Sequence, residues 1–319
     1  MSKNASRILL SFHETPNVAF MDPATVLPPK YKIWWLAARP KTLWAAVTPV
    51  IMAGAIALSD RVFHPWSFFA ALCGGLLIQI GTNFANDLFD FKKEVDTRER
   101  LGPPRATQAG WVTPRQMSHA TIIVFALALL VGIYLVHRGG LPLAIIGLLS
   151  VLCGVLYTAG PFPLGYIGLG EIFVLIFFGP VPLCGTYYVM AKHLTAPVLF
   201  AGLAPGLLSV AILVVNNLRD IDTDKTSGKR TLAVRFGRRF AMAEYGISVA
   251  LGLLYPLAHY LCFRSHQLVM LSAMLMPASI PLIRTVITSR DGNVLNGSLA
   301  ATGRLLFLYG LCFSIGWLL

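Results

Sequence analysis

The sequence predicts an all-α integral membrane protein with nine transmembrane helices in a bundle. Three observations carry that prediction: 56% of the 319 residues are hydrophobic, only 13% are charged, and the mean hydropathy is +0.68. Charged residues make up about 25% of an ordinary soluble domain. Apolar runs of about 20 residues, the length that crosses a bilayer, recur along the whole chain. Together these features exclude a typical soluble protein.

The predicted membrane domain covers residues 33–319 and follows a cytoplasmic N-terminal arm, residues 1–32. The arm lacks the pattern of a cleaved signal peptide. Thr113 and Pro114 are typical of an N-cap and a first-turn residue before the third span. The nine predicted spans are 33–59, 66–88, 116–136, 141–158, 169–190, 194–217, 240–262, 267–288 and 301–319.

The distribution of basic residues predicts the orientation. Of 26 Lys and Arg, 22 lie in the N-terminal segment through Lys41, in the polar segments after spans two and six, or in the segment after span eight with its edges. Such segments face the cytoplasm, so the N-terminus is expected inside and the C-terminus outside. This distribution also accounts for the net charge of +12 without a nucleic-acid partner, and we expect none.

Eight of the 14 acidic residues gather in two polar islands, each ending an apolar run. Asp87, Asp90, Glu94, Asp96 and Glu99 lie in the first island. The second island contains Asp220, Asp222 and Asp224. An Asn-x-x-x-Asp pattern occurs in both (Asn83 to Asp87, and Asn216 to Asp220), which indicates two four-helix halves followed by a ninth helix.

The two islands predict a site for a divalent cation and a phosphate. Residues three, four and seven apart share one helix face, so Asn83, Asp87 and Asp90 form one stripe. Asn216, Asp220 and Asp224 form another. Oxygen ligands without Cys or His favour Mg²⁺ or Mn²⁺, and Mg²⁺ is commonly completed by substrate phosphates. Several Lys and Arg follow each island, as phosphate recognition requires. A diphosphate joined to a long apolar tail would suit such a site in a membrane.

Three other interpretations of the islands are possible from the sequence. The islands could be ordinary solvated loops, but that leaves their shared pattern on one predicted side unexplained. A cation-coupled transporter would place its acids near the bilayer midplane, whereas these acids lie at the ends of spans. A structural scaffold leaves the eight clustered acids without a role.

The motifs resemble those of the UbiA-type intramembrane prenyltransferases. Both islands are similar to that family's two aspartate-rich motifs. Four further similarities point to the branch of 1,4-dihydroxy-2-naphthoate polyprenyltransferases of menaquinone biosynthesis. They are ARPKTLWAAVTPV, RLGPPRATQAGWVT, YTAGPFPLGYIGLGE and NNLRDIDTDKTSGKRTLAVRFG.

The resemblance implies roles for residues of both islands. The implied Mg²⁺ ligands are Asp87, Asp90 and Asp96 for one ion, and Asp220 and Asp224 for the other. The distal ligand of the first motif is either Glu94 or Asp96. The resemblance implies that Lys229 neutralises the leaving diphosphate and that Tyr157 faces the prenyl cation. Expected substrate-binding residues are Asn83, Asn86, Arg39, Lys41, Arg105, Arg230, Asn216 and Asn217.

The implied reaction joins a polyprenyl diphosphate to an aromatic acid, with loss of diphosphate and CO₂, and gives demethylmenaquinone. Another aromatic acceptor, 4-hydroxybenzoate or homogentisate, is the nearest alternative within the family. The implied location is a bacterial inner membrane, with the active site facing the cytoplasm. The sequence does not indicate prenyl length or protein partners.

Overall fold

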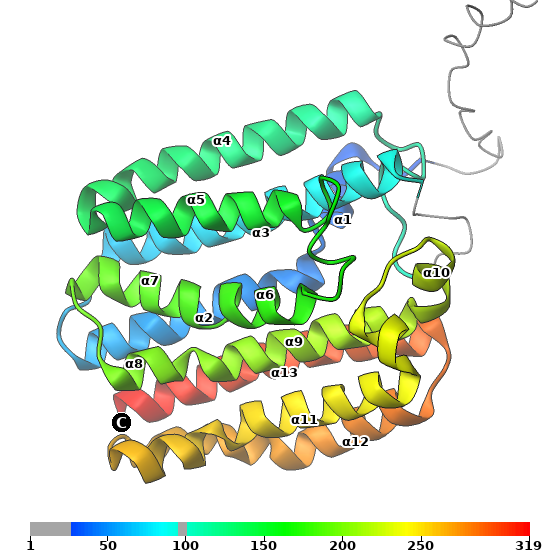
Figure 1. Cartoon of the computed structure of the whole chain (residues 1–319). Helices are drawn as coiled ribbons and strands as arrows, with labels where there is room; N and C mark the ends of the chain where they lie inside the picture. Colours follow the sequence, from blue (N-terminus) through cyan, green and yellow to red (C-terminus); the bar gives the residue numbers. More distant parts are fainter. Residues whose placement is uncertain (1–26, 95–100) are drawn as a thin grey trace, which may run out of the picture.

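Long helices run side by side in the computed structural model of the protein, which describes residues 27–94 and 101–319 (Figure 1). The helices are α1 (Lys30–Ala38), α2 (Pro40–Ser59), α3 (Pro65–Lys92), α4 (Pro114–Gly139), α5 (Leu141–Leu156), α6 (Gly170–Phe177), α7 (Pro180–Ala191), α8 (Ala196–Ala201), α9 (Leu203–Arg219), α10 (Ile221–Thr226), α11 (Leu232–Phe263), a 3₁₀ helix (Gln267–Leu275), α12 (Met276–Thr288) and α13 (Gly292–Leu318). All nine predicted spans are therefore helical, and the fold class is all-α as predicted.

Eight helical stretches of the described chain are long and apolar enough to span a membrane. Three of them join two consecutive helices: α6 and α7, α8 and α9, and the 3₁₀ helix and α12. The predicted span 141–158 is the exception, because α5 has 16 residues and a bilayer-spanning helix needs about 20. The finding is thus eight candidate spans plus one shorter apolar helix.

Glycines allow the α6–α7 span and the α8–α9 span to cross in close contact. A Cβ on Gly179 would lie 2.5 Å from the Gly202 carbonyl oxygen, and one on Gly206 would lie 2.5 Å from the Leu175 carbonyl oxygen. Carbon atoms do not approach oxygen this closely, so a larger residue would separate the two spans. The breaks are positions where two backbones pack directly.

The first predicted span is also interrupted, at Arg39. We expected 33–59 to be continuous, but α1 ends at Ala38 and α2 begins at Pro40, with Arg39 in the left-handed region at φ 54°. Proline disfavours a helical conformation of the preceding residue, which explains the break. By contrast, Thr113 and Gln116 form the capping box that starts α4, and Pro114 is its first residue, which confirms the predicted start.

The main apolar core lies between α2, α7, α9, α11 and α13. Met52, Leu183, Leu208, Leu253 and Phe313, one from each helix, are fully buried. On α4, in contrast, Ile122, Leu130 and Ile133 are about two-thirds exposed, as expected for a helix facing lipid. A second, smaller core joins α1 and α3 to the loop of residues 101–113.

The predicted acidic islands meet at one end of the bundle. The C-terminal ends of α3 and α9 lie there together with α10 and the loop of residues 157–169, on the right in Figure 1. We call this the polar end. The C-terminus of the chain lies at the opposite end of the bundle (Figure 1).

Candidate functional site

Two cavities of different chemistry share Tyr157 as a lining residue. One has a volume of about 90 Å³ and lies at the polar end. Its polar or charged lining residues are Arg39, Asn86, Asp90, Arg105, Tyr157, Thr158, Tyr166, Asn216, Asn217, Asp220, Thr223, Asp224, Lys229 and Thr231. The other has a volume of about 510 Å³, is almost wholly apolar, and also includes Tyr157 in its lining. We call them the polar cavity and the apolar cavity.

The two acids of α3 occupy different surroundings. Asp90 lines the polar cavity and is 1% exposed. Its carboxylate pairs with the Arg105 guanidinium and accepts a hydrogen bond from the Tyr166 hydroxyl. Asp87 is absent from the lining of that cavity. Its two oxygens accept hydrogen bonds from the backbone N–H groups of Ala106 (2.9 Å) and Thr107 (3.0 Å). Asp87 therefore anchors the loop that carries Arg105 to Asp90.

Two acids of the second island, Asp220 and Asp224, also line the cavity, each beside a cation. Arg219 donates to both oxygens of Asp220, at 2.7 and 2.5 Å. Lys229 Nζ lies 3.4 Å from Asp224 Oδ1. Burial raises the pKa of Asp224 above its usual value, although Lys229 opposes that shift. Electrostatic pairing thus keeps carboxylates stable in a largely buried cavity.

The loop of residues 157–169 places a second tyrosine at the site. The Tyr166 ring lies beneath two ammonium groups, with Lys229 Nζ at 4.8 Å and Lys93 Nζ at 5.0 Å from its centroid. Both are cation–π contacts. Burial lowers the pKa of Lys93, which donates to the Thr158 and Gly160 carbonyls. Tyr166 was not among the predicted site residues, although it lies within the Gly/Pro-rich stretch that we singled out.

The four predicted asparagines have distinct partners. Asn83 donates to the Ala38 carbonyl at 2.9 Å, so it holds the end of α1 and is absent from the polar cavity's lining. Three others line that cavity. Asn86 accepts from the Thr158 hydroxyl, Asn216 accepts from Arg219, and Asn217 donates to Glu171.

The predicted cations divide in the same way. Arg39 and Arg105 line the polar cavity, as does Lys229. Lys41 and Arg230 are exposed and absent from its lining. The structure also identifies Arg219, which holds Asp220 and which the sequence had not singled out. Asp96 lies outside the described residues, and Glu94 is exposed.

Tyr157 lines both cavities, and three carboxylates influence its phenol. Burial raises the pKa of its phenol well above the usual value, and the charges of Glu171, Asp224 and Asp90 add to that shift. The phenol therefore stays protonated and neutral at physiological pH. It can face a cationic or apolar group without carrying a charge of its own.

The donor chemistry of the polar cavity fits Mg²⁺. Asp90, Asp220 and Asp224 offer oxygen atoms, and no Cys or His lines the cavity within the described chain. Among the described residues, no three acidic, His or Cys side chains converge closely enough to hold a metal by themselves. Mg²⁺ usually takes only one or two carboxylates and leaves its other positions to water and phosphate.

Comparison with known proteins identifies relatives over most of the chain. Residues 46–318 match the UbiA prenyltransferase family. The chain is 32% identical to 1,4-dihydroxy-2-naphthoate octaprenyltransferase of Haemophilus influenzae over 302 residues, which is 91% of this chain and 97% of that protein. It is 39% identical to the Escherichia coli protein of the same name over 241 residues, 74% of this chain and 78% of that protein.

Solved structures share the fold. A UbiA homologue from Archaeoglobus fulgidus, bound to DMAPP and Mg²⁺, matches with a TM-score of 0.63 and covers 88% of this chain and 99% of its own. The two sequences are 13% identical. The likeness at that identity concerns the arrangement of the helices.

Proposed function

The chain belongs to the UbiA prenyltransferase family, and from that premise we propose that it prenylates 1,4-dihydroxy-2-naphthoate. A polyprenyl diphosphate is the donor, diphosphate and CO₂ leave, and the product is demethylmenaquinol, the two-electron-reduced form of demethylmenaquinone. The observation that carries the proposal is the junction at Tyr157 of a charged cavity with an apolar one. A polyprenyl diphosphate has the same division between a charged head and an apolar tail.

We propose that the polar cavity binds the diphosphate. Arg39, Arg105 and Lys229 line it and offer the cations that phosphate recognition requires. Asp90 would hold one Mg²⁺, and Asp220 and Asp224 would hold a second, each together with diphosphate oxygens. Asp87 and Asp96 remain predicted ligands of the first ion. When bound, Mg²⁺ would stabilise the charge that develops on the departing diphosphate.

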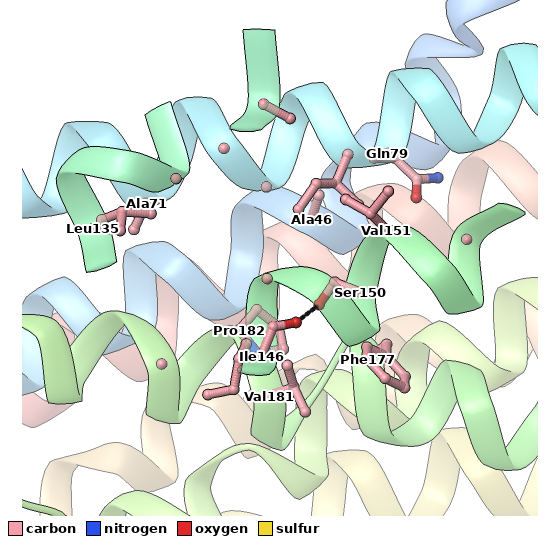
Figure 2. A pocket seen from close by; sticks show the side chains of 18 of the residues that line it. Ala46, Ala71, Gln79, Leu135, Ile146, Ser150, Val151, Phe177, Val181 and Pro182 are labelled. Atoms are coloured by element: carbon pink, nitrogen blue, oxygen red, sulfur yellow. Dashed lines mark hydrogen bonds between the residues drawn. The ribbon is translucent and has the colours of Figure 1, made fainter. Parts of the chain in front are cut away.

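The apolar cavity is the proposed site of the prenyl chain. Its wall is made by α2, α3, α4, α5, α6 and α7, and Figure 2 shows side chains such as Ala46, Leu135, Val151 and Phe177 directed into it. Leu129 and Ile133 of α4 and Leu148 of α5 line the cavity and are 55%, 65% and 66% exposed. Their exposure at the cavity wall supports entry of the donor from the bilayer.

The residues at the junction support a reaction through an allylic cation. As the C–O bond of the donor breaks, Arg105 and Lys229 balance the negative charge left on the diphosphate. The apolar walls exclude water, so the cation persists until the ring carbon that carries the carboxylate attacks it. A carbon–carbon bond forms there and CO₂ leaves. The neutral Tyr157 phenol faces the reacting carbon atoms without competing as a nucleophilic phenolate.

We also propose the orientation in the membrane. The polar end would face the cytoplasm of a bacterial inner membrane, because 22 of 26 basic residues lie on the side predicted to be cytoplasmic. α5 would be the fourth of nine crossings and would thin the bilayer locally because it is short. Two four-helix halves, completed by α13, would form one domain over residues 33–319.

The test of the acceptor is a competition assay. Purified protein in nanodiscs would receive Mg²⁺, a polyprenyl diphosphate, and equal amounts of dihydroxynaphthoate, 4-hydroxybenzoate and homogentisate. We expect prenylated naphthoate to be the main product by mass spectrometry. Prenylation of one of the other acids instead would overturn the assigned acceptor and leave the family unchanged.

A further inference from the structure

Glu171 is a buried acid that the proposed reaction does not use. It lies in the first turn of α6 and is 7% exposed. Its Oε1 accepts a hydrogen bond from Asn217 Nδ2 at 2.9 Å. Within the described chain no Lys or Arg forms a salt bridge with it. Acids buried in a membrane protein without a cation are rare and usually functional.

The bond to Glu171 fixes how the Asn217 amide is turned. Asn217 Nδ2 donates to Glu171 Oε1 at 2.9 Å, so the NH₂ group of Asn217 faces Glu171. The amide oxygen, Oδ1, then points to the opposite side of the side chain. Asn217 lines the polar cavity, and in the described chain no hydrogen bond to its Oδ1 is present.

Asn217 differs in this respect from the other two amides of the cavity. Asn86 Oδ1 accepts a hydrogen bond from Thr158 at 2.9 Å, and Asn216 Oδ1 accepts one from Arg219 at 2.9 Å. Their oxygens are therefore engaged by the protein. Asn217 is the one cavity-lining amide, among the described residues, whose oxygen remains available to a ligand.

An available oxygen selects the chemistry of that ligand. A diphosphate has only acceptor oxygens at neutral pH and is bound by cations and N–H donors. It would be repelled by Asn217 Oδ1. A group that carries an O–H donor would be attracted instead, because the carboxylate behind the amide increases the negative charge on its oxygen. The ring hydroxyls of an aromatic acceptor are such donors.

The pair also lies near the point where donor and acceptor must meet. A Cβ on Gly170, the neighbour of Glu171, would lie 2.9 Å from the Tyr157 hydroxyl. Tyr157 lines both cavities. An acceptor hydroxyl bound to Asn217 would thus hold its ring close to the junction of the cavities, where C1 of the prenyl chain is expected.

We propose that Asn217 binds a ring hydroxyl of the aromatic acceptor and that Glu171 is the positioning residue that holds the Asn217 oxygen toward it. The inference rests on the function proposed above. It assigns to these two residues the recognition of the acceptor and not of the diphosphate. The acceptor class is a hydroxylated aromatic ring.

The test compares the natural acceptor with its monomethyl ethers, in which one hydroxyl can no longer donate. Glu171→Gln permits the Asn217 amide to turn over, because glutamine can donate as well as accept. Asn217→Leu removes the oxygen at similar size. In the wild type we expect one ether to lose about tenfold in kcat/KM, the effect of one hydrogen bond. In both variants KM for the acceptor should rise about tenfold, and the difference between hydroxyl and ether should disappear.

Controls separate this role from a structural one. KM for the prenyl diphosphate should not change in Glu171→Gln. Glu244→Gln, a partly buried acid on α11 near Glu171 that has no bond to Asn217, should behave as wild type. If Asn217→Leu fails to fold, the comparison of hydroxyl and ether in Glu171→Gln alone tests the proposal.

The inference would be overturned if the ratio of kcat/KM for the natural acceptor to kcat/KM for the ether were the same in wild type and in Glu171→Gln. A parallel rise in KM for the prenyl diphosphate would also overturn it. A wild type that prenylates none of the aromatic acids would overturn the proposed function itself, which is a distinct result because it is obtained without any variant.

Discussion

Replacement of Asp87 by asparagine tests whether this residue anchors a loop. Its carboxylate is 2% exposed and accepts two backbone N–H groups of the loop of residues 101–113. Hydrogen bonds to a charged group contribute about 1.5–3 kcal/mol each. The asparagine side chain would keep one acceptor, while its NH₂ group would face the other N–H donor. We therefore expect a loss of about 3 kcal/mol in stability.

The assay is thermal unfolding in detergent without Mg²⁺, combined with limited trypsin digestion. The melting temperature of Asp87→Asn should fall by roughly 5–10 °C. Cleavage after Arg105, which is 7% exposed in the folded chain, should accelerate because the loop detaches. Asp222→Asn, at an exposed acid of the second island, is the matched control and should melt as wild type.

The reasoning would be refuted if Asp87→Asn melted like wild type without Mg²⁺ but no longer gained stability when Mg²⁺ was added. That combination would make Asp87 a metal ligand and not a loop anchor. A carboxylate oxygen that accepts one N–H retains a second lone pair, so the two roles are compatible in principle. The metal-free melt separates them.

Two further predictions concern the walls of the cavities. Tyr166→Phe removes the hydroxyl that donates to Asp90 but keeps the ring beneath Lys93 and Lys229. We therefore expect kcat to fall about 5- to 30-fold, with little change in melting temperature. An unchanged kcat would exclude a role for the hydroxyl. Gly147 lines the apolar cavity, and a Cβ there meets no atom within 4 Å. Gly147→Leu should therefore raise KM selectively for long prenyl donors, and equal effects on short and long donors would contradict this role of the cavity.

The sequence predicted the helices well because each depends on local signals. Apolar length alone located the spans, and Thr113 with Pro114 located the start of α4. The break at Arg39 was missed, although Pro40 is a local signal for it. The number of spans was harder to predict, since α5 has 16 residues and its membrane character depends on its neighbours.

The polar cavity was only partly predictable from residue spacing. Helical periodicity placed Asp87 and Asp90 on one face, but it could not show that Asp87 points to a loop 20 residues later in the chain. Tyr166 was missed because its role arises from a tertiary contact with Asp90, which leaves no periodic pattern in the sequence. Arg219 was missed although it directly precedes Asp220, because spacing alone does not show that its side chain turns back to that carboxylate.

The most direct measurement of the central claim follows diphosphate release and prenylated naphthoate together, in nanodiscs with Mg²⁺. Wild type would be compared with Asp90→Asn and Asp220→Asn, each with and without EDTA. We predict that wild type forms both products in equal amounts and that EDTA or either substitution abolishes both. Turnover that persists in EDTA, or in both variants, would contradict a metal–diphosphate site at the polar end of the bundle.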